Sequence, residues 1–147
     1  RLLIVDHSRT GGSQQMARAA YDAARNEIET VLLRADLAGP EDLVAADGYI
    51  FCAPENLAAI AGVMKDFFDR CYYPVLGQIE AKPYAQMVCA GSDGTNAVRQ
   101  IARIAQGWRL REVQDQPRTE PGFIRSRPRP RSRPSIPGGR ATQRPPS

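Results

Sequence analysis

Short apolar runs alternate with amphipathic stretches along most of the chain. Continuous apolar runs, typical of strands buried on both faces, occupy residues 2–5, 30–33, 48–53 and 84–90. Apolar residues recur at helical spacing in residues 14–26, 58–73 and 95–108, and a short helix is expected at residues 40–44. This alternation predicts βαβ units that form a doubly wound parallel sheet of the α/β class.

Local signals predict where several elements begin and end. Ser13 is expected to cap the first long helix, Pro54 to stop the third strand and Pro74 to end the second long helix. The periodic pattern stops after Val113. The sequence therefore predicts one domain over residues 1–113, followed by a tail over residues 114–147.

The tail has a composition of its own. Residues 117–147 hold eight of the twelve prolines and eight arginines, with Glu120 as the one acid. We expect the tail to be disordered, because so few apolar residues cannot offset the entropy lost on ordering. An anion-binding arm, a solvated linker and out-of-frame translation of a GC-rich gene all fit this composition. We favour the last, because the pattern stops where another strand is due.

Charge and composition narrow the function classes. The overall net charge of +4 comes from the tail, since residues 1–116 carry 12 basic and 15 acidic residues, a net charge of −3. Nucleic-acid binding by the domain is therefore disfavoured. No apolar run reaches the roughly 20 residues that cross a bilayer, and no signal-peptide pattern is present, so we expect a cytoplasmic protein without a membrane segment. The three cysteines are expected to be free thiols, and a single histidine disfavours a zinc site.

Three small polar loops follow predicted strands one, three and four. They are residues 8–13 (SRTGGS), residues 54–57 (PENL) and residues 91–94 (GSDG). Ligands of doubly wound sheets bind beyond the carboxyl ends of the strands, near the point where strand order reverses. The three loops are therefore expected to meet at one edge of the sheet and form a binding site.

The first loop has the chemistry of a phosphate site. Gly11 and Gly12 let backbone amides approach an anion, and the helix that follows directs its free N–H groups and positive dipole end toward it. The hydroxyls of Ser8, Thr10 and Ser13 can donate further hydrogen bonds. A plain glycine-rich turn with a serine cap remains an alternative. The loop matches neither the P-loop nor the GxGxxG dinucleotide motif.

In order along the chain, these loops resemble those of a known family. Residues 8–13 match the [ST]-x-T-G-x-[ST] phosphate loop of flavodoxins. Residues 54–57 with residues 62–70 (GVMKDFFDR) resemble the second flavin loop and helix of the flavodoxin-like NAD(P)H-dependent FMN reductases, and residues 90–94 resemble their third loop. The resemblance covers residues 2–113 and implies a flavodoxin-like sheet with strand order 2-1-3-4-(5).

The resemblance also implies a cofactor, a reaction and a set of site residues. FMN would pass reducing equivalents from NAD(P)H to a quinone, a flavin or a similar small acceptor, with no catalytic residue or metal supplied by the protein. A homo-oligomer is also implied. The residues expected to bind FMN are Ser8, Thr10, Gly11, Gly12 and Ser13 at the phosphate, Pro54, Glu55, Asn56 and Leu57 at the ribityl chain and ring, and Gly91, Ser92, Asp93 and Gly94 at the polar edge of the ring.

Two departures from the family pattern keep other functions open. The second and third loops offer no aromatic side chain to stack on a flavin, which favours a reductase over an electron-transfer flavodoxin. The final helix of the family is replaced by the tail, so apolar side chains of strands one and three are expected to face water on one side. A structurally incomplete product without activity is therefore the main alternative, and an electron-transfer flavodoxin is the next.

Overall fold

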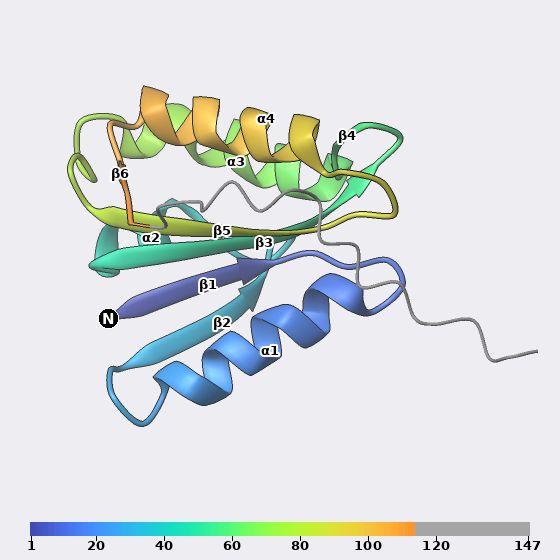
Figure 1. The fold of residues 1–147 in the computed structure, drawn as a ribbon. Coiled ribbons are helices and arrows are strands. Elements are labelled where there is room, and N and C mark those ends of the chain that lie inside the picture. Colours follow the sequence, from blue (N-terminus) through green and yellow to red (C-terminus); the bar gives the residue numbers. More distant parts are fainter. Residues whose placement is uncertain (114–147) are drawn as a thin grey trace, which may run out of the picture.

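Strands and helices alternate through residues 1–113, the part of the chain that the computed structural model describes (Figure 1). The predicted disorder of residues 114–147 lies outside the described residues. In chain order, the elements are β1 (Leu2–Asp6), α1 (Gly12–Ala24), β2 (Thr30–Arg34), α2 (Pro40–Ala45), β3 (Gly48–Asn56), β4 (Ala59–Ile60), α3 (Gly62–Val75), β5 (Pro83–Cys89), α4 (Thr95–Gly107) and β6 (Arg111–Glu112).

The main sheet has the predicted order and direction, with β5 and β6 as the predicted strands four and five. Its strands lie in the order β2-β1-β3-β5-β6 and all neighbours are parallel, while β4 pairs antiparallel with the end of β3. In the register of the sheet, Ile4 lies opposite Leu32 on one side and Ile50 on the other. β1 and β3 adjoin at the centre, so the doubly wound α/β prediction is confirmed.

One face of the sheet carries the larger core, under α2, α3 and α4 (Figure 1). Phe51 lies at its centre and is completely buried. Its ring contacts five other aromatic rings, with centroid distances between 5.1 and 6.5 Å, which belong to Tyr49, Phe67, Phe68, Tyr84 and Trp108. Stacked, tilted and edge-on aromatic pairs of this kind add to the stabilisation that burial alone provides. This cluster joins β3 and β5 to the two long helices.

The other face is covered by α1 alone among the described elements (Figure 1). α1 crosses the sheet at a slant and contacts β1, β2, β3 and β5. Ile4 and Cys52 are completely buried against Ala17, whereas Ile50 and Met87 are only half-buried. The expectation that β1 and β3 expose their apolar side chains on this face is therefore wrong for Ile4 and Cys52, because α1 lies directly over them.

The predicted end of the third strand is wrong. Pro54 does not stop β3, which continues to Asn56. The carbonyl of Cys52 points toward β1 and accepts a bond from His7 N at 3.0 Å. Backbone groups two residues apart in a strand point to the same side, so the nitrogen of Pro54 also points toward the β1 side. β1 has ended there, and the missing N–H of proline costs no ladder bond.

The second long helix begins later than its apolar pattern predicts. Leu57 and Ala58 form a tight turn with φ angles of 50° and 62°, after which β4 pairs back onto β3 and α3 starts at Gly62. Turns that need two positive φ angles favour asparagine and glycine. Leu57 and Ala58 carry no such signal, so the sequence pattern did not indicate a hairpin here.

The first helix also begins differently from the prediction. α1 starts at Gly12, and its N-cap is Gly11, with a φ of 97°. Ser13 therefore lies inside the first turn and is not the cap. A Cβ atom added to Gly12 would lie 2.7 Å from Cys89 Sγ, so the start of α1 packs directly on the last residue of β5.

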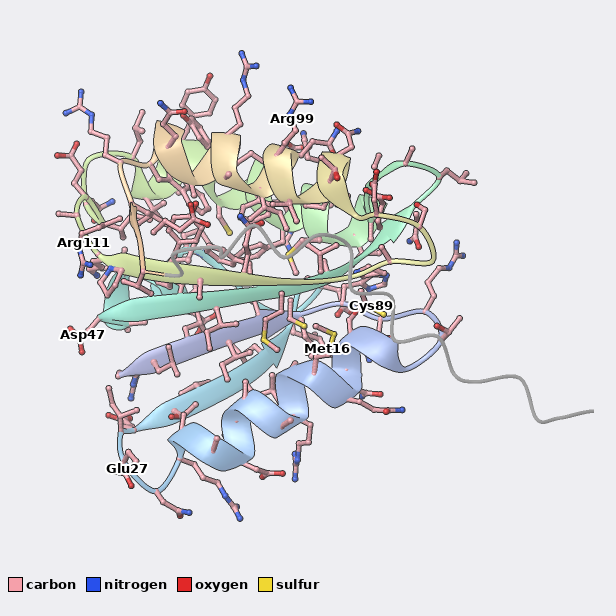
Figure 2. The ribbon with its side chains drawn as sticks, viewed as in Figure 1. Met16, Glu27, Asp47, Cys89, Arg99 and Arg111 are labelled. Carbon is pink, nitrogen blue, oxygen red and sulfur yellow. The ribbon has the colours of Figure 1, made fainter. Side chains whose placement is uncertain are left out.

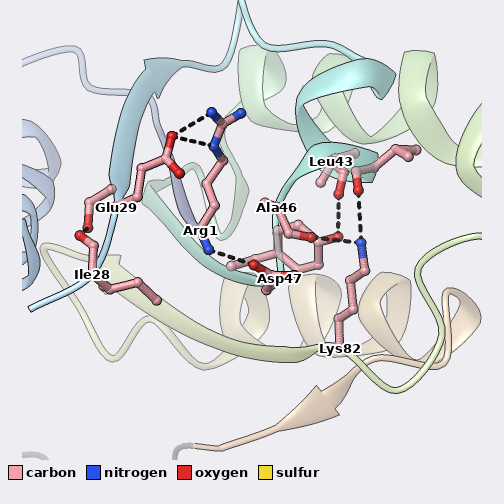
Figure 3. Close-up of polar contacts among 10 residues, drawn as sticks. Arg1, Ile28, Glu29, Leu43, Ala46, Asp47 and Lys82 are labelled. Carbon is pink, nitrogen blue, oxygen red and sulfur yellow. Dashed lines mark hydrogen bonds and ion pairs between the residues drawn. The ribbon is translucent and has the colours of Figure 1, made fainter.

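Polar contacts tie down the opposite, amino-terminal edge of the sheet (Figure 3). The Arg1 guanidinium donates to Glu29 Oε1, with an Nε–Oε1 distance of 2.9 Å. Lys82 Nζ donates to the carbonyls of Val44 and Ala46 at 3.0 and 2.7 Å, which satisfies the last turn of α2. These bonds fix the end of the sheet that lies away from the three predicted loops.

Asp6, the last residue of β1, is a buried carboxyl group whose side chain forms no hydrogen bond or ion pair with the other residues of the described part, 1–113. Its exposed fraction is 5%, and burial raises its pKa above the usual range, while the nearby charges of His7 and Arg34 act in the opposite direction. Because the folded state favours the protonated form, ionised Asp6 lowers the stability of the fold at neutral pH.

We predict that Gly12→Ala destabilises the domain by about 1–3 kcal/mol, although alanine in a helix is normally favoured over glycine. The new methyl group would press on Cys89 Sγ. Cys89→Ala removes that sulfur, and the double variant should then recover stability. Urea unfolding of the single and double variants measures this coupling.

Gly62→Ala is the matched control for this prediction. Gly62 is likewise the first residue of a helix, but an added Cβ there meets nothing within 4 Å. It should leave stability unchanged or raise it slightly. Equal effects of the two glycine substitutions, or no coupling between Gly12→Ala and Cys89→Ala, would contradict the proposed contact.

We predict that Asp6→Asn stabilises the domain at neutral pH and that this gain disappears as the pH falls toward 3.8, the ordinary carboxyl value. Because the pKa of Asp6 is raised in the folded state, ionisation of Asp6 at neutral pH lowers the stability of the wild-type protein. Protonation in acid restores that stability. Denaturant unfolding across this pH range measures the difference, with exposed Glu27→Gln as the control. A gain of the same size at all pH values would argue against a buried, ionising Asp6.

Candidate functional site at the carboxyl edge of the sheet

The three predicted loops meet at the carboxyl edge of the parallel sheet. The chain that leaves β1 remains attached to β3 through the His7 N–H, which donates to Cys52 O. Gly12 at the start of α1 lies against Cys89 at the end of β5, and Figure 2 shows Cys89 beside the first turns of that helix. β3 and β5 continue in register to Pro54 and Cys89 before their loops begin. The structure thus brings the loops together as the topology predicts.

The first loop leaves hydrogen-bonding groups free for an anion. Ser8 Oγ accepts a bond from Gly11 N at 2.8 Å, which shapes the turn and leaves the hydroxyl hydrogen of Ser8 available to donate elsewhere. Thr10 is exposed. The first turn of α1 has neither an acidic residue nor a side-chain cap, so its N–H groups and positive dipole end are not neutralised there.

Ser13 tests whether this loop suits a phosphate group. Its side chain is 1% exposed, and Ser13 Oγ has no hydrogen-bond partner among the described residues. A buried hydroxyl without a partner normally costs about 1–3 kcal/mol. An unpaired donor in the first turn of a helix whose dipole is free is what a bound phosphate oxygen would satisfy, so the residues of this loop fit the phosphate of FMN.

The second loop forms the end of a small hairpin. Pro54 and Asn56 are half-buried within β3, and Leu57 at the tip is fully exposed. Leu57 and Ala58 at the tip both adopt left-handed backbone angles. Such angles are uncommon for residues other than glycine and are maintained by surrounding contacts. The structure therefore places an apolar side chain in solvent at the edge where the loops meet.

Glu55 joins the second loop to the third. Its Oε1 accepts a bond from Ser92 Oγ at 3.3 Å, and its Oε2 accepts one from Ala97 N at 3.1 Å in the first turn of α4. The N-terminus of α4 therefore already has a carboxylate partner, in contrast to that of α1. Gly91, Ser92 and Asp93 are exposed, and Gly94, with a φ of 69°, is the buried N-cap of α4.

Two residues that the sequence analysis did not single out also belong to this arrangement. Asn96 Nδ2 donates to Ala58 O at 2.5 Å, and Gln100 Oε1 accepts from Ile60 N at 2.7 Å. Asn96 and Gln100 lie four positions apart on α4, so they face the same side of the helix. The sequence shows that these two side chains lie on the same side of a helix, but it carries no signal for the hairpin that they hold.

Two buried cysteines offer little reactivity. Burial raises the pKa of Cys52 to about 12 and that of Cys71 to about 11, which keeps both thiols protonated.

Within residues 1–113, no three His, Cys, Asp or Glu side chains gather as metal ligands would. A hollow of about 340 Å³ lies elsewhere, between α3 and α4, and is lined by Lys65, Tyr72, Gln100, Arg103 and Ile104. None of the helices in residues 1–113 has the length and apolar character needed to cross a membrane.

Solved structures of flavodoxins have the same fold. A flavodoxin from the domain Archaea superposes with a TM-score of 0.69 at 15% identity, covering 77% of this chain and 78% of its own. A WrbA-like flavodoxin from Agrobacterium tumefaciens superposes with a TM-score of 0.61 at 22% identity, covering 74% and 73% of the two chains. These likenesses establish a flavodoxin-like fold.

Sequence comparisons place the chain more closely. It is 32% identical over 84 residues to a flavodoxin from Aquifex aeolicus, an alignment that covers 56% of this chain and 45% of that protein. The chain thus spans less than half of this relative. The model of the NADPH-dependent FMN reductase family matches residues 38–117, more than half of the chain. The chain belongs to the flavodoxin-like NADPH-dependent FMN reductase family.

Proposed function

We propose that the chain binds FMN at the carboxyl edge and passes reducing equivalents from NAD(P)H through it to a quinone, a flavin or a similar small acceptor. The observation that carries this proposal is the free N-terminus of α1, where the buried Ser13 hydroxyl has no hydrogen-bond partner within residues 1–113. Membership of an FMN reductase family supports FMN as the cofactor and an oxidoreductase as the class of protein.

Each loop has a distinct part in this proposal. The hydroxyls of Ser8, Thr10 and Ser13 and the amides of Gly11 and Gly12 would hold the phosphate. Pro54, Glu55, Asn56 and Leu57 would border the ribityl chain and ring, and Gly91, Ser92, Asp93 and Gly94 would meet the polar edge of the ring. Bound FMN would supply the redox chemistry, while the protein binds and orients it.

The exposed tip of the hairpin favours a reductase. Leu57 is the apolar side chain at this tip, and no aromatic residue occurs at positions 54–57 or 91–94. A flavin without an aromatic cover would leave one face open to a nicotinamide or a quinone. We further propose that the protein is cytoplasmic. We also propose that it associates with itself, because Ile50 and Met87 stay half-buried on the face that α1 covers.

An electron-transfer flavodoxin is the second candidate. The relative from Aquifex aeolicus and several structures with the same fold are named flavodoxins. Such a carrier would hold FMN at the same edge but exchange electrons with a protein. Retention of FMN without oxidation of NADH or NADPH would favour the carrier over the reductase.

We predict that Ser13→Ala has opposite effects on stability and on FMN binding. Removing a buried, unpaired hydroxyl should leave the flavin-free protein as stable as before or more stable. Removing a donor to the phosphate should weaken FMN binding by about tenfold. Thermal unfolding and quenching of FMN fluorescence measure the two effects.

Riboflavin, which lacks the phosphate, is the control ligand for this prediction. Ser13→Ala and Thr10→Ala should weaken binding of FMN and leave binding of riboflavin unchanged. If both flavins lose affinity equally, the loop does not bind the phosphate. If the unsubstituted chain binds neither flavin, FMN is not its cofactor.

We predict that the FMN-loaded chain oxidises NADPH or NADH when a quinone is present, and that the flavin-free chain does not. The loss of NAD(P)H absorbance with and without acceptor measures this reaction. The Thr10→Ala variant should reach the rate of the unsubstituted chain when FMN is saturating, because the substitution affects cofactor binding alone. Stable FMN binding with no NAD(P)H oxidation would overturn the reductase proposal.

A further inference from the structure

The Glu55 side chain makes two bonds that point in different directions. At the end of β3, one carboxylate oxygen accepts from the backbone of Ala97 in α4 and the other from the hydroxyl of Ser92. Bonds from a charged acceptor to a helix N-terminus gain from the helix dipole as well as from hydrogen bonding. A single side chain therefore connects the hairpin, the third loop and the start of α4.

Two further bonds strengthen the same connection from the side of α4. Asn96 donates to Ala58 O and Gln100 accepts from Ile60 N, on either end of β4. The hairpin between these bonds has two left-handed residues in succession, Leu57 and Ala58. Such a backbone needs external contacts to remain in one conformation. Among the described residues, these contacts come from α4.

We propose that Glu55 is a positioning residue that holds the hairpin of residues 55–60 and the loop of residues 91–94 in the arrangement that receives the ring end of FMN. This inference rests on the proposed function. It assigns Glu55 a role through Ala97 and Ser92, in addition to its proposed place beside the ribityl chain and ring. The side chain sets the spacing between the two loops on either side of the ring.

The N-termini of α1 and α4 differ in their carboxylate partners. α1 and α4 both begin at the carboxyl edge of the sheet, and either N-terminus could attract an anion. At α4, Glu55 Oε2 accepts from Ala97 N and Asp93 Oδ1 accepts from Thr95 N, and both carboxylates would repel a phosphate. At α1, no acidic residue lies in the first turn. This difference agrees with the phosphate at α1 and with the uncharged ring beside the hairpin.

This role predicts a different pattern from that of the phosphate loop. A variant that disturbs the ring loops should weaken FMN and riboflavin by the same factor, because both flavins carry the same ring. Glu55→Ala should raise both dissociation constants by about tenfold. Glu55→Gln keeps an oxygen that can accept from Ala97 N, so it should restore part of the loss.

Titration of the full chain with FMN and with riboflavin tests the inference, together with hydrogen exchange of the flavin-free protein. In Glu55→Ala, the amides of Ala97 and Ile60 should exchange faster, while amides of the β1–β3 pair keep their protection. Glu27→Ala is the matched control, because Glu27 is an exposed glutamate on the turn after α1 and lies outside the site. It should change neither titration nor exchange.

The outcomes separate this inference from the proposed function. Weaker binding of FMN with unchanged binding of riboflavin would place Glu55 at the phosphate and overturn the inference. Unchanged exchange at Ala97 and Ile60 would show that Glu55 does not hold the loops. Failure of the unsubstituted chain to bind either flavin would refute the proposed function and the flavin role of Glu55, whereas faster exchange in Glu55→Ala would still demonstrate the connection between the loops.

Discussion

The burial of Phe51 in the middle of β3 is the packing interaction on which the rest of the structure depends. β3 is the central strand, paired with β1 on one side and β5 on the other, and Phe51 contacts aromatic rings from its own strand, from β5, from α3 and from the residue after α4. Large aromatic side chains contribute most to a core of this size. With Phe51 in place, the ends of β1, β3 and β5 are aligned, and so are the loops that follow them.

The two faces of the sheet contribute differently to the site. The face under α3 and α4 forms the large core that fixes strand alignment. The face under α1 is thinner, yet it controls the phosphate loop, because the start of α1 is held by contacts with two strands. Cys52 Sγ donates to Ser13 O at 3.1 Å, and Gly12 leaves room for Cys89 Sγ. Strand packing is thus transmitted directly to the loop that we propose binds phosphate.

Charge is distributed along the carboxyl edge in a way that suits one anion at one place. Glu55 satisfies the N-terminus of α4, while the N-terminus of α1 retains its positive end. Asp6 is buried next to the first loop, and its raised pKa reflects the cost of keeping a carboxylate there. An ion at α1 therefore interacts with hydroxyls and backbone amides, which is the chemistry of a phosphate cradle.

The sequence by itself determined the order of the elements, the α/β class and the position of the three loops. Continuous apolar runs mark buried parallel strands, helical spacing marks the covering helices, and parallel topology brings the loops to one edge. Local patterns of this kind depend only on neighbouring residues, so they can be read directly. The same local reading predicted Ser8, Thr10 and Gly11 as phosphate-binding residues.

Only the tertiary structure decided how the second loop is built. β3 continues through Pro54 because β1 has already ended beside it, and the turn at Leu57 and Ala58 exists because α4 holds the hairpin. The partners of Glu55, Ser92 and Ala97, are about forty residues away in sequence. Hydrogen bonds over such separations depend on the packed fold, and no local pattern of apolar and polar residues encodes them.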